Sequence, residues 1–376
     1  MGKKKKLRAQ FRKNQQVRAR QSDWTRKFEN QEAELADTDR VERVSGKGAL
    51  TRQRTIVAEE AGADLPLLEV DESTCLRGRV ISVHGLTSLV QADDGRRYHC
   101  ATRRLLKSLA TDQRNVVAAG DVVLFRPAPS TEPIGEGIIE RVEPRHGVLS
   151  RTSRGRQHVI VANVDQVLIV GSAAEPDLKP HLIDRFLVTA EQCGIRPVIV
   201  INKIDLVDPA SLQPLIGVYA QMGYTVLTVS AATGFGIDRL RRVMRGRGSA
   251  VAGQSGVGKS SLLNAIEPSL GLRVREVSRD TQKGRHTTTS AMLVPLADGG
   301  YVVDTPGIRQ FQLWDVVPEE IAGWFRDIRP FVNHCRFPDC THTHEDDCAV
   351  KDAVADDLLD ARRYESYCHL FAGDEV

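Results

Sequence analysis

The stretch SAVAGQSGVGKSSLLNAI, Ser249–Ile266, decides the fold of this 376-residue chain. An apolar run precedes a glycine-rich segment, and a helical pattern of apolar residues follows it. The spacing G-x-x-x-x-G-K-[ST] is matched by Gly253, Gly258, Lys259 and Ser260. In that pattern backbone N–H groups turn onto phosphate, the lysine reaches the β and γ oxygens, and the hydroxyl ligates magnesium. The stretch therefore predicts a strand, a phosphate-binding loop and a helix.

The chain around this stretch alternates between apolar strand-like runs and amphipathic helical runs from His158 onward. Such alternation is typical of βαβ units, which build a mostly parallel sheet covered by helices. Nucleotides bind such sheets at the carboxyl ends of the strands. The runs are HVIVANVDQVLIVGS (158–172), HLIDRFLVTAEQCG (181–194), RPVIVINKID (196–205), SLQPLIGVYAQMG (211–223), YTVLTVSA (224–231) and GIDRLRRVMRG (236–246).

A base-reading motif, NKID at 202–205, ends the apolar run RPVIVI. The Asp205 carboxylate can accept hydrogen bonds from the ring N–H and the exocyclic amine of guanine, whereas adenine presents an acceptor in place of that ring N–H. Unpaired acceptor oxygens are costly, so the motif favours GTP over ATP. Asn202 and the Lys203 stem would brace the loop and cover the base. SAATG, at 230–234, would complete the base pocket with backbone groups.

Two further segments follow the phosphate loop, HTTT at 286–289 and DTPG at 304–307. Asp304 ends an apolar run and can hold magnesium through water, while the Gly307 N–H can sense the γ-phosphate. The threonine run offers a hydroxyl for a second magnesium contact. Thr288 is the favoured candidate, and the threonines on either side of it remain open.

These motifs stand in an unusual order along the chain. In a guanine-nucleotide switch protein the phosphate loop ordinarily comes first and the base-reading motif last. A circular permutation explains the reversal, because the termini of a domain often lie close together and the sheet can be re-threaded with every loop in place. The expected nucleotide contacts are Asn202, Lys203, Asp205, Ser230, Ala231, Gly253, Gln254, Ser255, Gly256, Val257, Gly258, Lys259, Ser260, Ser261, Asp304 and Gly307, with magnesium on Ser260 and Thr288.

Short β-branched runs separated by Gly, Asp and Pro fill residues 76–145. Five strands in about seventy residues predict a small antiparallel barrel of the OB type, whose face and loops often bind oligonucleotides. Fold alone does not fix function, so a barrel that serves only as a spacer is the alternative.

The first 22 residues hold nine Lys or Arg and no acidic residue, although the net charge of the whole chain is only +3. The segment has few apolar residues, which predicts a flexible arm. Such arms commonly neutralise nucleic-acid phosphates. A solubilising tail or a targeting signal is the alternative.

Three of the seven cysteines cluster in HCRFPDCTHTHEDDC, at 334–348. The segment offers three thiolates and an imidazole, from Cys335, Cys340, His342 and Cys348. This set of ligands suits tetrahedral structural zinc. Four such ligands leave no position open for water. His344 and His334 are rival fourth ligands, and reduced thiols without a metal are the alternative.

The composition narrows the class of protein. No apolar run approaches the eighteen or so residues that a membrane span needs, and the N-terminus lacks the apolar segment of a secretory signal. An odd number of cysteines fits poorly with a disulfide framework. The length suggests two or three domains. We therefore expect a cytoplasmic multidomain protein without a membrane partner.

The chain closely resembles the ribosome small-subunit-dependent GTPase A family of bacteria. The resemblance is carried by the motif order, the preceding barrel and the segments GQSGVGKSSLLNA, GRHTTT, DTPGIRQF and C-x₄-C-x-H-x₅-C. The resemblance runs from about Leu76 to near the C-terminus. It implies a GTPase that binds the small ribosomal subunit late in assembly and uses hydrolysis to leave. It also implies zinc ligation by Cys335, Cys340, His342 and Cys348.

The expected organisation is a multidomain α/β chain: a basic extension at 1–70, an OB-fold RNA-binding barrel at 71–147, a circularly permuted GTPase domain at 148–325 and a zinc-binding helical domain at 326–376. We expect a monomer that uses GTP, Mg²⁺ and one structural Zn²⁺. Its barrel, zinc domain and basic tail would grip ribosomal RNA.

Two other functions remain open. The chain could be an RNA-binding adaptor in which GTP only stabilises the fold, or a GTPase acting on transfer RNA or another structured RNA. Turnover that rises by orders of magnitude with small subunits supports the assembly factor, and flat turnover supports the adaptor. The third function is distinguished by which RNA stimulates hydrolysis.

The group that positions the attacking water is not the usual one. Ras-like GTPases use a glutamine just after D-x-x-G, but Gly307 is followed here by Ile308, which cannot hydrogen-bond to water. The free enzyme is therefore expected to be slow. The nearest polar candidate by motif is His286, and Arg285 or ribosomal RNA are its rivals.

We predict that His286→Ala leaves GTP affinity nearly intact but removes most subunit-stimulated hydrolysis, because the lost contact is made only in the transition state. By contrast, Lys259→Ala or Ser260→Ala should impair phosphate and magnesium binding itself. GTP titration and turnover with small subunits measure both effects. Stimulated turnover close to wild type in the His286 variant would move the catalytic role elsewhere.

Overall fold

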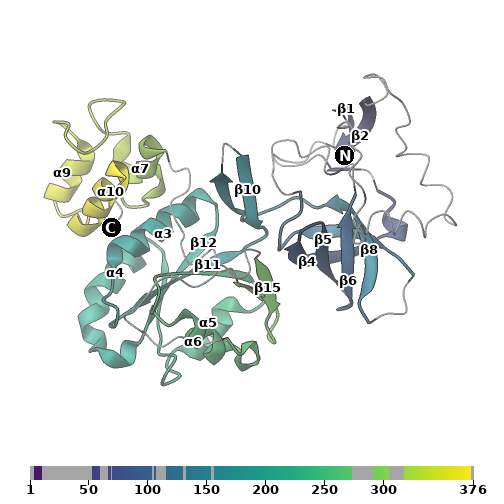
Figure 1. Cartoon of the computed structure of the whole chain (residues 1–376). Helices are drawn as coiled ribbons and strands as arrows, with labels where there is room; N and C mark the ends of the chain where they lie inside the picture. Colours follow the sequence, from purple (N-terminus) through teal and green to yellow (C-terminus); the bar gives the residue numbers. More distant parts are fainter. Residues whose placement is uncertain are drawn as a thin grey trace. The chain divides into compact units, whose positions relative to one another are not determined.

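The computed structural model describes residues 70–103, 106, 116–129, 133–153, 156–272, 291–304 and 317–373. It also describes three N-terminal strands, β1 (Lys4–Gln10), β2 (Gln53–Glu59) and β3 (Leu67–Leu68). Only the backbone is described in these three strands and at residues 151–153, 156–158 and 304. The chain divides into two compact units (Figure 1). The first comprises Met1–Asn163 with Ser290–Leu293, and the second Val164–Thr289 with Val294–Val376.

The first unit contains a closed barrel of five strands, β4 (Leu76–His84), β5 (Thr87–Ala92), β6 (Arg97–Thr102), β7 (Val122–Pro127) and β8 (Gly135–Val142). Its strand order is β4-β5-β6-β8-β7, and β7 pairs with β4 to close the ring. All pairs are antiparallel except β6 with β8, which are parallel. The small barrel expected from the sequence is confirmed.

Alternating burial along the strands fills the barrel with apolar side chains. Val80, Val90, Phe125 and Ile139 are completely buried. Gly78 is required in β4, because a Cβ atom there would lie 2.7 Å from the Gln91 carbonyl oxygen. An antiparallel pair follows the barrel, β9 (Leu149–Ser153) and β10 (Arg156–Val161).

The second unit is built on a parallel sheet with the order β13-β12-β11-β14-β16. Every residue of β12 after Arg196 is buried, as expected for a strand covered on both faces. The register aligns the strand ends, with Ser172 opposite Asn202. The bounds are β11 (Gln166–Ser172), β12 (Arg196–Asn202), β13 (Thr225–Thr228), β14 (Gly248–Ala252) and β16 (Tyr301–Asp304). Strand β15 (Met292–Pro295) is divided between the two units.

Helices cover both faces of this sheet, with α3 and α4 on one face and α5 and α6 on the other (Figure 1). The helices are α3 (Pro180–Gln192), α4 (Gln213–Gln221), α5 (Ile237–Met244) and α6 (Lys259–Ile266). Single 3₁₀ turns are η3 (Glu72–Thr74), η4 (Ile204–Leu206), η5 (Pro209–Leu212), η6 (Pro268–Leu270) and η8 (Pro318–Glu320). The α/β class expected from the alternating pattern is confirmed.

A helical module, residues 317–373, ends the described chain and belongs to the second unit. Its apolar cluster includes Phe325, Ile328 and Tyr367, together with Val188 from α3. Its helices are α7 (Ile321–Trp324), α8 (Arg329–Val332), α9 (Ala349–Ala355) and α10 (Ala361–Ala372). Within the described ranges, the helices are all too short or too polar to cross a membrane.

Candidate nucleotide site and cysteine–histidine cluster

The predicted phosphate loop lies between β14 and α6, where three glycines adopt backbone conformations that side chains disfavour. The φ angles of Gly253, Gly256 and Gly258 are 142°, 85° and 90°. A Cβ atom at Gly253 would lie 2.2 Å from the Val170 carbonyl oxygen, and one at Gly258 would lie 2.5 Å from the Asn202 amide nitrogen. Glycine at these positions therefore lets the loop curl against β11 and β12.

The loop presents donors to an anion at the start of α6. The first N–H groups of an α-helix have no partner within the helix, so those of Lys259, Ser260 and Ser261 point toward the loop. The Lys259 ammonium donates to the carbonyl oxygens of Gly253 and Gln254 at 2.7 and 2.6 Å. These two carbonyls hold the ammonium over the loop, where a phosphate oxygen could replace them.

Asn202 connects the three loops predicted to bind the nucleotide. Its side-chain nitrogen donates to the Val257 carbonyl oxygen at 2.9 Å, and its side-chain oxygen accepts from the Ala231 N–H at 3.2 Å. The residue is 1% exposed. The base-reading loop, the phosphate loop and the SAATG loop are therefore fixed to one another by a single buried amide.

Of the residues that follow Asn202 in the base-reading loop, Lys203 is half-buried, Ile204 is buried and Asp205 is exposed. Lys203 has a left-handed backbone, with φ of 60°, and its ammonium donates to the Glu175 carbonyl oxygen. Asp205 is exposed within η4. In the SAATG loop, the buried Ser230 hydroxyl accepts from the Thr233 N–H at 3.1 Å. The Asp205 carboxylate is thus free of the packing that fixes the rest of the loop and can reach a base.

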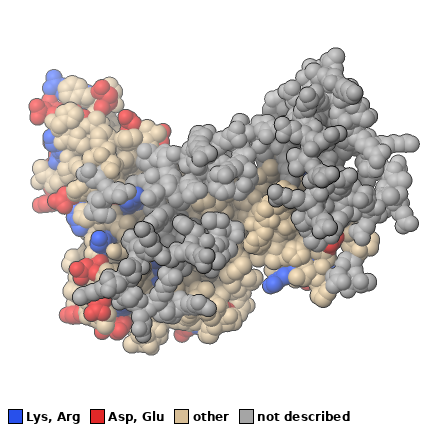
Figure 2. Space-filling model, viewed as in Figure 1, with Lys and Arg blue, Asp and Glu red and all other residues tan. Residues whose placement is uncertain are grey.

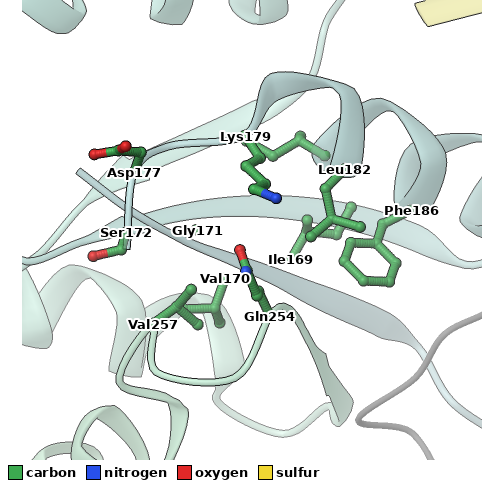
Figure 3. Close-up of a pocket in the computed structure, with 11 residues that line it drawn as sticks. Ile169, Val170, Gly171, Ser172, Asp177, Lys179, Leu182, Phe186, Gln254 and Val257 are labelled. Atoms are coloured by element: carbon green, nitrogen blue, oxygen red, sulfur yellow. The ribbon is translucent and has the colours of Figure 1, made fainter. Parts of the chain in front are cut away.

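A small hollow borders the phosphate loop on the side of α3, and the sequence patterns did not indicate it. Its walls are the end of β11, the phosphate-loop residues Gln254 and Val257, and the first turns of α3. Figure 3 shows the Lys179 side chain extending toward Gln254. The only sequence signal was the polar pair Asp177 and Lys179 between a buried strand and an amphipathic helix.

Several predicted site residues cannot be placed. His286, Thr288, its two neighbouring threonines and Gly307 lie outside the described residues. Asp304 ends β16, but the structure describes only its backbone. The magnesium contacts of Thr288 and Asp304, and the positioning of water by His286, stay predictions.

The cysteine–histidine cluster is assembled in the helical module. The ligand atoms of Cys335, Cys340, His342 and Cys348 all lie within 4.8 Å of one another. The Cys335 and Cys348 sulfurs are 3.8 Å apart, and the His342 Nδ1 atom lies 3.3 and 3.5 Å from them. Tetrahedral zinc with Zn–S bonds of about 2.3 Å requires sulfur separations of about 3.8 Å. The donor set and its spacing therefore fit zinc.

Neither rival histidine belongs to this group. His344 is 80% exposed and contacts the Thr343 hydroxyl at 3.1 Å, and His334 is absent from the four-residue cluster within the described part of the chain. Burial raises the pKa of the Cys340 thiol to about 12 and lowers the pKa of His342. A neutral imidazole can donate its lone pair to a metal, whereas the thiol needs a nearby cation to ionise.

Hydrogen bonds outside the cluster shape the loop that carries His342. Glu345 accepts from the Thr341 N–H at 2.6 Å, the Thr343 N–H at 3.1 Å and the His344 N–H at 3.2 Å. The Tyr364 hydroxyl of α10 donates to the His342 carbonyl oxygen at 2.8 Å. The imidazole is thus presented by a loop whose backbone is fixed from both sides.

Comparison with known proteins gives one consistent family. Residues 142–314 match the family model described as RsgA GTPase. The small ribosomal subunit biogenesis GTPase RsgA of Sodalis glossinidius is 42% identical over 330 residues, which cover 85% of this chain and 91% of the relative. The protein of the same name from Chlorobaculum parvum is 41% identical over 302 residues, covering 78% and 97%.

Solved structures agree with this match. YjeQ from Thermotoga maritima is 36% identical, with a TM-score of 0.66, and the match covers 80% of this chain and 98% of YjeQ. YloQ, described as a circularly permuted GTPase, is 28% identical with a TM-score of 0.63, covering 81% and 96%. The circular permutation expected from the order of the motifs is therefore confirmed.

We predict that Asn202→Ala lowers the affinities for GTP and GDP together, by about tenfold to hundredfold, because the buried Val257 carbonyl and the half-buried Ala231 N–H both lose their partner, at a cost of about 1–3 kcal/mol. Titration with fluorescent nucleotides measures both affinities. The matched control is Asn264→Ala, since Asn264 also bonds through both amide atoms to backbone, at Leu272, but away from the motif loops. Equal effects of the two substitutions would contradict the role given to Asn202.

Proposed function

The chain belongs to the RsgA GTPase family, and we propose that it binds the small ribosomal subunit late in assembly and leaves it when GTP is hydrolysed. Membership makes the chain a GTPase. Its relatives are named small ribosomal subunit biogenesis GTPases, which supports a role in the biogenesis of that subunit. Binding of the subunit and release upon hydrolysis are the steps that we add.

The observation that carries this function is the joining of the motif loops by Asn202. Its amide atoms contact Val257 in the phosphate loop and Ala231 in the SAATG loop. Three loops that follow three different strands thereby meet at the carboxyl edge of the sheet, where nucleotides bind. The motifs therefore act together as one site rather than as chance matches.

Guanine is the base that this site would select. The Asp205 carboxylate is exposed next to the fixed Asn202 and can accept from the ring N–H and amine of guanine. Adenine offers an acceptor in place of that ring N–H and would leave the carboxylate unpaired. Backbone groups of Ser230 and Ala231 complete the pocket in this proposal.

The triphosphate would lie along the glycine loop. The Lys259 ammonium would exchange the carbonyl oxygens of Gly253 and Gln254 for phosphate oxygens, which gives stronger, charge-assisted hydrogen bonds. Magnesium, when bound, neutralises charge on the β and γ phosphates. We assign the hydroxyls of Ser260 and Thr288 to it, with Asp304 acting through water.

A structural zinc ion is assigned to Cys335, Cys340, His342 and Cys348. Four ligands leave no position open for water, so the metal would stabilise the module and take no part in hydrolysis. Its contribution would be to hold together the segment 335–348, which carries all four ligands.

Ribosomal RNA is assigned to the barrel, the basic N-terminal arm and the zinc module. On the face shown in Figure 2, basic and acidic side chains of the described residues are interspersed over the surface. The basic run of residues 1–22, which holds nine Lys or Arg and no acidic residue, is the main candidate for phosphate contacts. The domains proposed for these roles are an extension at 1–70, a barrel at 71–147, a GTPase domain at 148–325 and a zinc domain at 326–376. A monomer in the bacterial cytoplasm suffices for this function.

We predict that purified small subunits raise the rate of GTP hydrolysis by roughly 10²-fold or more, because a partner must order the catalytic loops, whereas large subunits do not. Phosphate release from the full chain, with each subunit added separately, measures the effect. Flat turnover would support an RNA-binding adaptor. If another structured RNA stimulated hydrolysis equally, that RNA would replace the small subunit as the proposed partner.

We predict one zinc ion per chain by metal analysis, and we predict that Cys340→Ser releases it and loosens the helical module. Cys368→Ser is the matched control, because Cys368 lies in the same module but outside the four-residue cluster. Proteolysis of the C-terminal segment measures the loosening. A chain that contains no metal and folds normally would end the zinc assignment.

A further inference from the structure

A buried ion pair connects the helical module to helix α3. The exposed fractions of the Arg363 and Asp184 side chains are 1% and 0%. The Arg363 guanidinium donates to the Asp184 carboxylate at 2.6 Å and, through two nitrogens, to both oxygens of the Asp327 carboxylate at 2.9 Å. Buried charges are tolerated only when their hydrogen bonds are complete. The position of the guanidinium is therefore set by two carboxylates at once.

The buried carboxylate of Asp184 has two further donors. The Tyr219 hydroxyl of α4 donates to it at 2.7 Å, and the Ser366 hydroxyl of α10 donates at 2.6 Å. The His181 Nδ1 atom lies 2.7 Å from the same serine hydroxyl. Burial raises the pKa of Tyr219, so the phenol remains a donor at neutral pH. Helices α3, α4 and α10 are thus joined by one polar network.

Other contacts fix the rest of α3 to the helical module. The Arg326 guanidinium forms an ion pair with Glu191 at 2.7 Å and lies over the Tyr224 ring, 4.3 Å from its centroid. Val188 packs in the apolar cluster of the module. Helix α3 is therefore fixed to the module along its length.

The same helix borders the phosphate loop. Leu182, Ile183 and Phe186 of α3 line the hollow whose other walls include Gln254 and Val257 of that loop (Figure 3). These side chains of α3 and the two loop residues therefore face the same small hollow. One side of α3 thus lies beside the phosphate loop across this hollow, while another is fixed to α10.

The segment that leads into α3 makes a second connection. The Glu175 carbonyl oxygen accepts from the Lys203 ammonium in the base-reading motif. Lys179, which precedes the first residue of α3, lines the hollow beside Gln254. The segment before α3 therefore accepts a hydrogen bond from the base-reading loop and lies beside the phosphate loop.

We propose that Asp184 and Arg363 are positioning residues for the nucleotide site, through which nucleotide binding and the ordering of α10 stabilise each other. The inference rests on the proposed function, because it requires a nucleotide at the phosphate loop. Coupling between two sites is reciprocal: a module that holds α3 in place favours the bound loop, and a bound loop favours the docked module.

Hydrogen–deuterium exchange of the full chain, with and without the non-hydrolysable analogue GMPPNP, tests the coupling. In the wild-type chain the analogue should slow exchange in both α6 and α10, the latter by about fivefold or more. The double variant Tyr219→Phe, Ser366→Ala removes two donors to Asp184 but keeps Arg363. It should retain the slowing in α6 and lose most of the slowing in α10.

Two further variants sharpen the test. Arg363→Met should abolish the coupling. Circular dichroism shows whether this variant still folds, and if it does not, the milder double variant keeps the test valid. The control is Arg245→Met, which breaks the exposed 3.6 Å ion pair with Asp298 in the same unit and should leave the coupling intact.

The outcomes separate this inference from the proposed function. Unchanged exchange in α10 of the wild-type chain, despite slowing in α6, overturns the coupling and leaves the nucleotide site intact. Full slowing of α10 in the double variant likewise overturns the role of the buried pair. Absence of slowing in α6 contradicts nucleotide binding itself, and the inference fails with it.

Discussion

The buried amide of Asn202 is the constraint on which the nucleotide site depends. The permuted order places the base-reading loop 55 residues before the Val257 carbonyl that it contacts. Backbone connectivity alone does not set the distance between such loops, because each follows a different strand. The Asn202 side chain donates to one loop and accepts from another, and it thereby sets the distance between them. Its burial keeps water from competing for either hydrogen bond.

Permutation also changes which segment of the chain follows each strand of the sheet. In the sequence, β16 continues through the DTPG motif into the helical module, so the segment predicted to sense the γ-phosphate and the cysteine cluster share one stretch of chain. The Asp184–Arg363 pair provides a non-covalent connection between the same module and the helix beside the phosphate loop. The covalent link thus joins the module to β16 of the sheet, and the buried ion pair joins it to α3.

The sequence predicts best what depends on neighbouring residues. The phosphate loop follows from local glycine positions, the barrel from short strands and turns, and the cysteine–histidine cluster from ligands within one short segment. The Asp184–Arg363 pair could not be predicted, because its partners are 179 residues apart and an arginine in ARRYESYCHLFA resembles any charged residue on an exposed helix face. The roles of His286 and Thr288 remain predictions, since they lie outside the described residues.

A buried ion pair differs from an apolar contact in what it specifies. Apolar contacts specify shape and volume, whereas a guanidinium between two carboxylates also requires one orientation of its N–H groups. The same α10 that carries Arg363 also donates from the hydroxyls of Tyr364 and Tyr367 to the backbone of His342 and Thr341. Hydrogen bonds therefore connect the loop of the cysteine–histidine cluster to α10, and α10 to α3. Since α3 also lines the hollow beside the phosphate loop, α10 and α3 lie between the cluster and the proposed nucleotide site.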